Sequence, residues 1–446
     1  MQTKREKSGY EMMLLPSLES FIPEDHNLRR LDKVLDLSFI RDTVQDRYCQ
    51  TNGRPSVDPE VIIRLFLIQA IDGIVHVREL MRQVQVNLAY RWFIGYGLDE
   101  KLPDHSTLSK ALDRFGDDVF NELFKRSIGQ CQSSGLIEGK VLHVDATTIR
   151  ADIDRTRVGK PDSSDPDARY GKFPGKRTAP GYKQHTVVDN KSRVILGLSV
   201  TPANSSEHNE AVAVIDSAID RLTCSPQAVC ADGAYSSGNN CAALEDRGIR
   251  LVSPPPKAKN QFGGSCFTVE DFVYDEKKDV FICPAKSILK YIGDVKARSH
   301  QRRYAGLRSV CRNCKLKDKC TKSSRRQLKV GINHASLIRL RADSQTESFK
   351  KLYRSRAPVI EGIFGEAKEW HGLRRAWRRG LSKMLVQSLL IATVLNLKRL
   401  AAVYHLLNAI KITFKTGINS IFNFIERLWH KTDDVSRLNT ITINYA

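Results

Sequence analysis

The chain has 446 residues, more than the about 100–200 residues of one typical domain, so its length favours two or three domains. Its 71 Lys and Arg residues exceed its 50 Asp and Glu residues, and a net charge of +21 favours a polyanionic partner such as nucleic acid. The most apolar stretch, 384–397, is too short and too polar for a membrane span, and the N-terminus lacks the apolar run of a secretion signal. We therefore expect a cytoplasmic protein with reduced cysteines and no membrane partner.

Residues 22–126 show a helical pattern. Asp58 and Pro59 suit the N-cap and first position of a strongly apolar helix, and Val77–Val86 is amphipathic. A further helix is expected near Asp104, where several side chains offer N-caps. Short helices joined by tight turns are typical of a helix-turn-helix-like DNA-binding domain, and equally of a plain helical bundle.

At Gly139 the pattern changes to the alternation of β-strands, and it indicates an α/β domain with a mixed sheet over residues 139–410. The expected order is a strand, a polar surface loop over 152–181, a hairpin, a helix, a strand, a helix and a strand. In chain order, the regular segments are 140–145, 185–188, 193–200, 210–222, 228–232, 239–247 and 250–253. Residues 255–345 interrupt this order with clustered Cys, Lys and Arg, so they are predicted to be a Cys-rich insertion within the α/β domain.

Two acidic residues stand where α/β proteins place their ligands. Asp145 and Asp232 are each predicted at the carboxyl end of a strand, and Gly233 permits a sharp turn directly after Asp232. One such Asp is usually a turn residue or a helix cap. Two of them in one sheet of a strongly basic protein favour a ligand site.

A third carboxylate is expected from the helix that is predicted to begin near residue 357, with Pro358 in its first turn. Glu361 and Lys368 are seven residues apart and share a face, whereas Glu366 lies about 140° round from Glu361 and is the competing candidate. Three converging carboxylates form a site for Mg²⁺ or Mn²⁺, and a pair of such ions supports phosphodiester chemistry. We therefore predict Asp145, Asp232 and Glu361 as metal ligands.

The insertion contains a second candidate metal site. Cys311 and Cys314 form a C-x₂-C pair, and Cys320 and Cys283 are within reach of it, with Cys266 as a competitor for the fourth place. Four thiolates are the donor set of a structural Zn²⁺ site, and an irregular segment gains order from such a site.

A basic cluster follows the predicted metal-site helix. Arg374, Arg375, Arg378 and Arg379 lie next to Trp370 and Trp377. Arginine beside indole suits phosphate contact combined with stacking on a base. A solvated basic surface is the alternative, but the position near Glu361 favours DNA.

Several blocks of the sequence resemble the DDE transposases of the insertion-sequence 1182 group, within the broader insertion-sequence 4/5-like set. The resemblance covers nearly the whole chain and lies in the order and spacing of the blocks. These are 52–59, 77–80 and 103–107 in the helical part, 144–148, 165–169, 181–183 and 232–235 in the α/β part, and Tyr353, Arg356, Glu361 and Lys368, which resemble the family's Y-R-E-K signature.

The resemblance implies an RNase H-like mixed-sheet catalytic core whose metal triad is Asp145, Asp232 and Glu361. It also implies DNA contacts for Tyr353, Arg356 and Lys368. The chain departs from the signature in having four residues between Arg356 and Glu361 instead of three. Lys183 is a further candidate for contacting DNA.

The implied activity is metal-dependent cleavage at transposon ends and strand transfer into target DNA. The expected partners are terminal inverted repeats and target DNA, bound by a homodimer at the nucleoid. Two other functions remain open. A transposase-derived protein without catalysis would bind DNA and not cut it, and a plain metal nuclease would hydrolyse DNA without joining strands.

Overall fold

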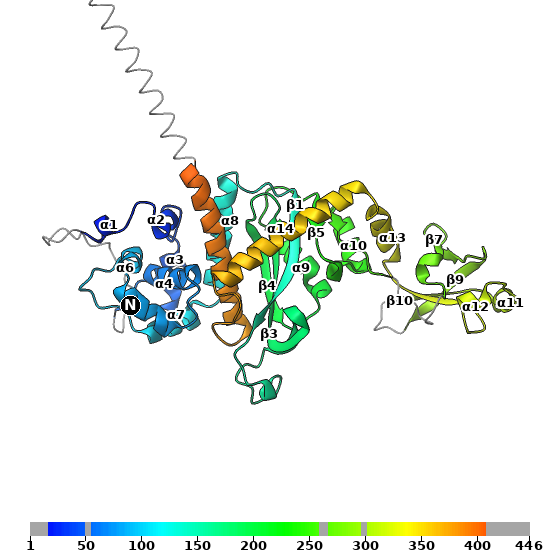
Figure 1. The fold of residues 1–446 in the computed structure, drawn as a ribbon, viewed down its shortest axis with the longest axis horizontal. Coiled ribbons are helices and arrows are strands. Elements are labelled where there is room, and N and C mark those ends of the chain that lie inside the picture. Colours follow the sequence, from blue (N-terminus) through cyan, green and yellow to red (C-terminus); the bar gives the residue numbers. More distant parts are fainter. Residues whose placement is uncertain (1–16, 50–54, 258–265, 296–300, 407–446) are drawn as a thin grey trace, which may run out of the picture.

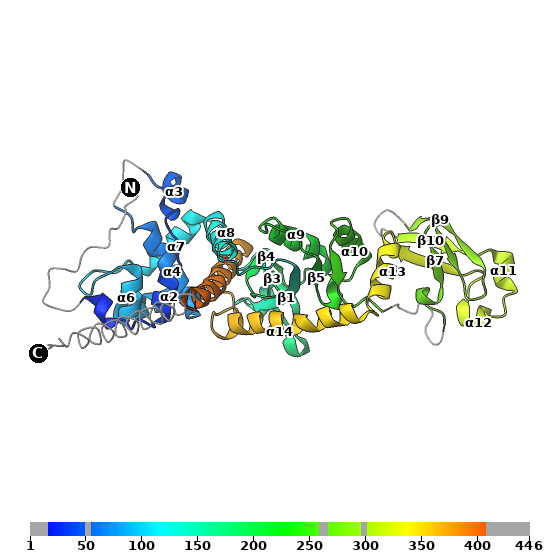
Figure 2. The ribbon, with the colours of Figure 1, turned by 90° about the horizontal axis from the view of Figure 1, so that it is seen from above.

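The computed structural model describes residues 17–49, 55–257, 266–295 and 301–406. In Figures 1 and 2 a group of helices, a central sheet and a second sheet follow one another along the long axis of the molecule. The N-terminal helices are α1 (Leu18–Phe21), α2 (Asn27–Asp32), α3 (Ile40–Val44), α4 (Pro59–Ile71), α5 (Val77–Val86), α6 (Leu88–Ile94), α7 (His105–Phe115) and α8 (Asp118–Ser133).

The predicted helix starts in this region are confirmed. The Asp58 carboxylate accepts the backbone N–H of Glu60 at 3.0 Å, and Pro59 occupies the first position of α4. Asp104 caps α7 in the same way through the N–H of Ser106 at 2.8 Å. Most of α4 is buried, so the other helices pack around it. Part of the first sequence block, residues 52–54, lies outside the described residues.

The central sheet is mixed, as the sequence predicts. Its strands are β1 (Val141–Arg150), β2 (Arg169–Phe173), β3 (Arg177–Asp189), β4 (Ile195–Pro202), β5 (Ala228–Cys230) and β6 (Arg250–Val252). They run in the order β2-β3-β1-β5-β6, and β4 also pairs with β3. β1 is antiparallel to β3 and parallel to β5.

Two sequence predictions about these strands are wrong. Asp145 lies in the middle of β1, which continues to Arg150, and not at its end. The segment predicted as a surface loop contains β2 and the start of β3, and it includes Asp165, which is buried and accepts the Tyr182 hydroxyl at 2.6 Å. A polar composition suggested a loop because the sequence alone does not show that these polar groups pair with one another.

Helices cover both faces of the sheet. Figure 2 shows α9 (Glu207–Ile219) and α10 (Gly238–Glu245) on one side and α14 (Glu347–Glu369) on the other. The buried residues of α14 include the predicted stripe Ile360, Ile363, Phe364 and Ala367. However, α14 begins at Glu347, so Pro358 lies inside the helix and not in its first turn.

The last helix that the structure describes, Leu381–Leu406 (hereafter the last helix), packs between the central sheet and α8. By length and composition it is able to cross a membrane, but 78% of its apolar window is buried inside the protein. A buried polar residue of this helix is paired there: the Asn396 side chain accepts the N–H of Ile195 at 2.8 Å and donates to the Ile195 carbonyl at 2.9 Å. This is the behaviour of a core helix in a folded domain.

The predicted insertion is a folded unit. It contains an antiparallel sheet of β7 (Val273–Asp275), β8 (Val280–Ile282), β9 (Ile288–Val295), β10 (Gln301–Ala305) and β11 (Gln327–Gly331), together with α11 (Arg308–Arg312) and α12 (Lys317–Cys320). A separate core of Phe272, Phe281, Leu289, Tyr304, Leu328 and Val330 holds it together. α13 (His334–Asp343) then leads back to α10 and α14.

Candidate active site

Asp145 lies in β1, and Asp232 follows the neighbouring parallel strand β5, which ends at Cys230, two residues earlier than the sequence predicts. His143 in β1 pairs with Cys230 in β5, and each aspartate lies two residues beyond its member of that pair. Side chains two residues apart point to the same face of a strand, and neighbouring strands lie about 4.8 Å apart. The register therefore brings the two aspartates side by side.

An arginine from α14 contacts the first of them. Arg356 Nη1 donates to Asp145 Oδ2 at 2.8 Å, and the two side chains are only 13% and 19% exposed. The Asp232 carboxylate instead accepts the N–H of Ala234 at 3.0 Å, at the start of the turn Gly233–Tyr235. Arg356 was predicted to contact DNA, but in this structure it forms an ion pair with Asp145.

Burial and neighbouring carboxylates raise the pKa of both aspartates. For Asp145 burial is the largest cause, opposed by the Arg356 guanidinium. For Asp232 burial is again the largest cause of the raised pKa, followed by the charges of Asp145 and Glu207. Ionising carboxylates that lie close together is unfavourable, and a bound divalent cation would remove this cost by neutralising their charges.

Glu207, the first residue of α9, is the site carboxylate that the sequence analysis missed. Its charge acts on both aspartates, and Lys183 Nζ donates to its Oε1 at 2.9 Å. Lys183 also donates to the Ser205 carbonyl at 3.0 Å, so this lysine, a predicted DNA contact, is engaged within the site. An acidic residue at a helix start ordinarily complements the helix dipole, so the sequence carries no signal of this role.

A buried hydroxyl lies in the same electrostatic environment. Tyr235 is 1% exposed, and within the described part of the chain its hydroxyl has no hydrogen-bond partner. Burial raises its pKa most, and the charges of Glu207, Asp145 and Asp232 raise it further. An unsatisfied polar atom next to three carboxylates fits a site that is completed by a metal ion and its waters.

Glu361, the predicted third ligand, stands apart from the two aspartates. Its side chain is exposed, and the next residue, Gly362, lies beside Arg193: a Cβ there would be 3.5 Å from the guanidinium. Arg193 belongs to the turn between β3 and β4, next to the start of β1, whereas Asp145 meets α14 at Arg356. Accordingly, no three His, Cys, Asp or Glu residues of the described ranges are grouped closely enough to hold a metal ion.

Glu366, the competing candidate, is occupied elsewhere. Lys398 and Arg399 of the last helix donate to its two carboxylate oxygens at 2.5 and 3.0 Å. His371, whose Nε2 lies 3.9 Å from Glu366 Oε1, lowers the pKa of Glu366 strongly, together with Lys398 and Arg399. Glu366 therefore anchors α14 to the last helix.

The remaining predicted DNA contacts fall into two groups. Tyr353 and Lys368 are half-buried on α14, where Tyr353 stacks on Phe349 and burial lowers the pKa of Lys368. The others lie in the segment that joins α14 to the last helix. Three of the arginines there are exposed: Arg374, Arg375 and Arg379. Arg374 pairs with Glu369, and the fourth arginine, Arg378, is half-buried.

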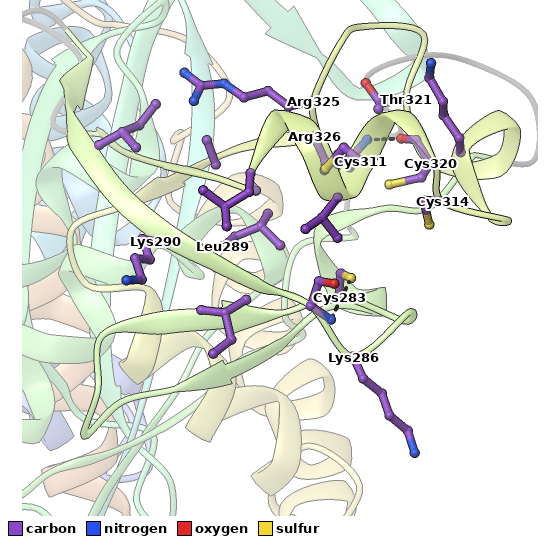
Figure 3. A pocket seen from close by; sticks show the side chains of 18 of the residues that line it. Cys283, Lys286, Leu289, Lys290, Cys311, Cys314, Cys320, Thr321, Arg325 and Arg326 are labelled. Atoms are coloured by element: carbon purple, nitrogen blue, oxygen red, sulfur yellow. Dashed lines mark hydrogen bonds between the residues drawn. The ribbon is translucent and has the colours of Figure 1, made fainter.

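The four predicted zinc ligands line a single cavity of about 610 Å³ in the insertion. Figure 3 shows Cys311, Cys314 and Cys320 on the α11–α12 segment and Cys283 just after β8. Burial, with smaller contributions from the other three cysteines, raises the pKa of the Cys320 thiol to about 11. The donor set suits zinc, but in the described ranges no three of these sulfurs are close enough to hold an ion.

Comparison with known proteins identifies two stretches of the chain. Residues 16–114 match a family described as "Transposase domain (DUF772)", and residues 282–401, which include Glu361, match one described as "Transposase DDE domain". No curated protein sequence matches the chain. Among solved structures, the piggyBac transposase synaptic complex with hairpin DNA is similar at 11% identity and a TM-score of 0.33, over 82% of this chain and 75% of that one, which is too distant to support an argument.

The two family matches occur in the order expected from the sequence blocks. The first covers most of the helical region that precedes the central sheet, and the second begins in the insertion and ends in the last helix. Each of these two stretches is therefore similar to a transposase domain, a DUF772 domain in the first and a DDE domain in the second.

Proposed function

We propose that this protein is an insertion-sequence transposase of the 1182 group, which cleaves phosphodiesters at transposon ends and transfers the ends into target DNA. The observation that carries the proposal is the pair of half-buried aspartates in β1 and directly after β5, which are neighbouring strands of the mixed sheet. The DDE family match and the net charge of +21 support it. We assign the sheet to the RNase H-like class on the same grounds.

Asp145 and Asp232 would hold Mg²⁺ or Mn²⁺. The bound ions would activate the attacking water or 3′-hydroxyl and stabilise the leaving oxygen. The third carboxylate has two candidates. Glu361 has to approach the aspartates through a movement of α14, whereas Glu207 is already in their electrostatic field.

Arg356 gives the site a counter-charge when no cation is present. Its guanidinium neutralises part of the charge on Asp145, which otherwise would be a buried carboxylate beside another one. A cation bound to Asp145 would replace this interaction and release Arg356. The freed guanidinium would then be available for a phosphate, which is the role that the sequence block implies.

Cleavage of DNA that carries the terminal inverted repeats flanking the gene tests the proposal. With Mg²⁺ present, we expect the wild type to nick the repeat ends and to produce strand-transfer products. Asp145→Ala should abolish both products, while Asp246→Ala, at an exposed carboxylate after α10, should leave both unchanged. Binding without cleavage would favour an inactive DNA-binding relative, and cleavage without strand transfer would favour a plain nuclease.

Calorimetric titration with Mn²⁺ separates the candidates for the third ligand. Glu207→Gln should weaken Mn²⁺ binding about tenfold or more in the free protein if Glu207 is a ligand. Glu361→Gln should weaken it only in the presence of end DNA if α14 has to move first. Equal affinities of both variants and the wild type, with and without DNA, would remove both residues from the metal site.

We also propose that the four cysteines of the insertion hold one structural Zn²⁺ after a small closure of the α11–α12 segment. Their common cavity and thiolate donor set support this assignment. Metal analysis of protein purified without chelators should find about one zinc per chain, and Cys314→Ser should lose it. Cys241→Ser, in α10, is the matched control and should retain it.

Pairing of two transposon ends makes a homodimer on DNA the expected assembly, and we place the active complex at the nucleoid. A complex of two chains with two DNA ends, measured by light scattering, would support this state. A complex of a single chain with a single DNA end under the same conditions would contradict it.

A further inference from the structure

A second pocket lies between the N-terminal helices and the segment that joins α14 to the last helix, residues 370–380, which we call the arginine loop. Its volume is about 460 Å³. One wall contains His76, just before α5, and Asp113 of α7. The other contains Arg375, Arg378 and Arg379 of the arginine loop and Lys383 of the last helix.

The charges in this pocket are mainly positive. Its four cations face two anions: Lys383 Nζ lies 2.9 Å from Asp113, and the Arg375 guanidinium lies 4.0 Å from Asp152. Arg378 and Arg379 have no carboxylate partner in an ion pair within the described ranges. The pocket therefore has an excess of positive charge to offer an anion.

Arg378 carries an unsatisfied donor. Its Nη2 is buried and, among the residues that the structure describes, lacks a hydrogen-bond partner, while the guanidinium carbon lies 5.5 Å from the centre of the Phe66 ring. Burial lowers the pKa of Arg378 to about 10, so the group stays charged at neutral pH. A buried charged donor without a partner is costly, and an anion that reaches it would remove the cost.

The arginine loop is held in place by hydrogen bonds to three parts of the protein. The Gln387 side chain donates to the carbonyls of Gly372 and Arg375 at 3.2 and 3.0 Å and accepts the N–H of Trp377 at 2.8 Å. Further bonds attach the loop to the end of β1 and to β3: Ala376 N–H to the Arg150 carbonyl at 2.8 Å, and Gly380 N–H to the Tyr182 hydroxyl at 3.0 Å. The guanidiniums are thus carried by a fixed backbone, which lowers the entropy lost on binding.

The arginine loop is attached to the end of β1, the strand that contains Asp145. Arg150, which bonds to the arginine loop, is five residues beyond Asp145 in β1, or about 16 Å. At about 3.4 Å per base pair, this corresponds to roughly five base pairs of duplex. A DNA end seated at Asp145 therefore has backbone phosphates within reach of the pocket.

We propose that this pocket binds a backbone phosphate of the DNA duplex, with Arg378, Arg379 and Lys383 as its ligands. The N-terminal helices and the α/β domain would then both contact the same DNA duplex at this pocket. This inference rests on the proposed function for the identity of the ligand and goes beyond it in naming the subsite. Asp113 limits the affinity of the pocket by competing with the phosphate for Lys383.

Salt dependence of binding to a fluorescent duplex of about 30 base pairs of mixed sequence, in EDTA and without catalysis, tests the proposal. Each lost phosphate contact should flatten the plot of log affinity against log salt by about 0.9. Between 50 and 200 mM NaCl, the affinity of the double variant Arg379→Gln/Lys383→Gln should therefore fall by a factor about threefold smaller than that of the wild type. Lys140→Gln/Lys277→Gln has the same loss of charge outside the pocket and should keep the wild-type slope.

A variant that is expected to bind DNA more tightly distinguishes a specific effect of the pocket from general damage to the fold. Asp113→Asn removes the competing anion and should tighten binding about threefold, which a misfolded protein would not do. Asp246→Asn makes the same change in net charge at an exposed position after α10 and should leave the affinity unchanged.

The proposal is overturned if the pocket pair and the control pair change the salt slope equally, or if Asp113→Asn does not tighten binding. Both outcomes are independent of cleavage. If Asp145→Ala abolishes cleavage and the salt slopes of the pocket pair and the control pair are equal, the transposase function is supported and phosphate binding by the pocket is contradicted. If the two salt slopes differ and the wild type does not cleave DNA, phosphate binding by the pocket is supported and the catalytic proposal is contradicted.

Discussion

At the scale of single residues, the ion pair between Arg356 and Asp145 decides how the site behaves without a cation. Removing the guanidinium should leave Asp145 with an uncompensated charge that a metal ion can neutralise. We expect Arg356→Gln to raise the affinity for Mn²⁺ about tenfold at pH 8 in the absence of DNA, as measured by calorimetry. Arg354→Gln, at an exposed arginine of the same helix, is the control. An unchanged or lower affinity of Arg356→Gln would contradict the role of Arg356 as a counter-ion.

Asp232 should cost the protein stability at neutral pH. Burial and the charges of Asp145 and Glu207 raise its pKa in the folded state, so the folded protein holds this proton more tightly than the unfolded chain. The penalty is therefore absent below the pKa of the unfolded chain, near 4, and grows as the pH rises through the folded pKa. Asp232→Asn, which keeps the oxygen that accepts Ala234 N–H, should raise the free energy of unfolding by about 0.5–2 kcal/mol at pH 7.

Urea unfolding at two pH values measures this effect. The gain should disappear near pH 3, about one unit below the unfolded pKa, where the wild-type carboxyl group is itself protonated in both states. A gain of the same size at both pH values would show that the carboxylate charge is not its cause.

At the scale of elements, Glu366 joins α14 to the last helix through Lys398 and Arg399. Its pKa is lowered in the folded state, so its contribution to stability is present above the unfolded pKa and is lost as the pH falls through the folded pKa. Glu366→Gln should lower the free energy of unfolding by about 1–3 kcal/mol at pH 7, because two charge-assisted hydrogen bonds are weakened. Equilibrium denaturation measures this loss.

The control for Glu366 is Glu369→Gln, which alters an exposed ion pair with Arg374 and should cost less than about 0.5 kcal/mol. Cleavage by Glu366→Gln at a temperature where it is folded should remain near that of the wild type. A folded Glu366→Gln protein that no longer cleaves would return Glu366 to the list of candidate metal ligands.

At the scale of the whole molecule, Asn396 connects three parts of the protein. Its side chain bonds the backbone of Ile195 in β4 and the Ser127 hydroxyl in α8, and its own carbonyl accepts the Cys131 thiol. Asn396→Leu would leave the buried N–H and C=O of Ile195 unpaired. We expect a loss of about 2–4 kcal/mol and a lower melting temperature for the N-terminal helices and the sheet together.

Hydrogen exchange measured residue by residue tests this coupling. Protection should fall in both α8 and β4 of the Asn396→Leu protein, and the β7–β11 sheet, which has its own core, should be unaffected. A loss of protection confined to one of the two elements would show that Asn396 does not couple them.

The sequence by itself determined the elements whose signals are local. The start of α4 at Asp58-Pro59, the bounds of α5 and the β3–β4 hairpin follow from capping and periodicity, which depend on neighbours along the chain. The positions of Asp145 and Asp232 in one mixed sheet followed from alternation and from the resemblance to known blocks. Their side-by-side placement needed the register between β1 and β5.

Only the tertiary structure decided which partners each charged side chain contacts. It paired Arg356 with Asp145 and Lys183 with Glu207, left Glu361 exposed, and placed the arginine loop against the N-terminal helices. Such partners come from segments far apart in the chain, and the free energy of a charge depends on its burial and its neighbours, not on its position in the sequence. The sequence therefore determined which residues bear the chemistry, and tertiary packing decided which of them are brought together.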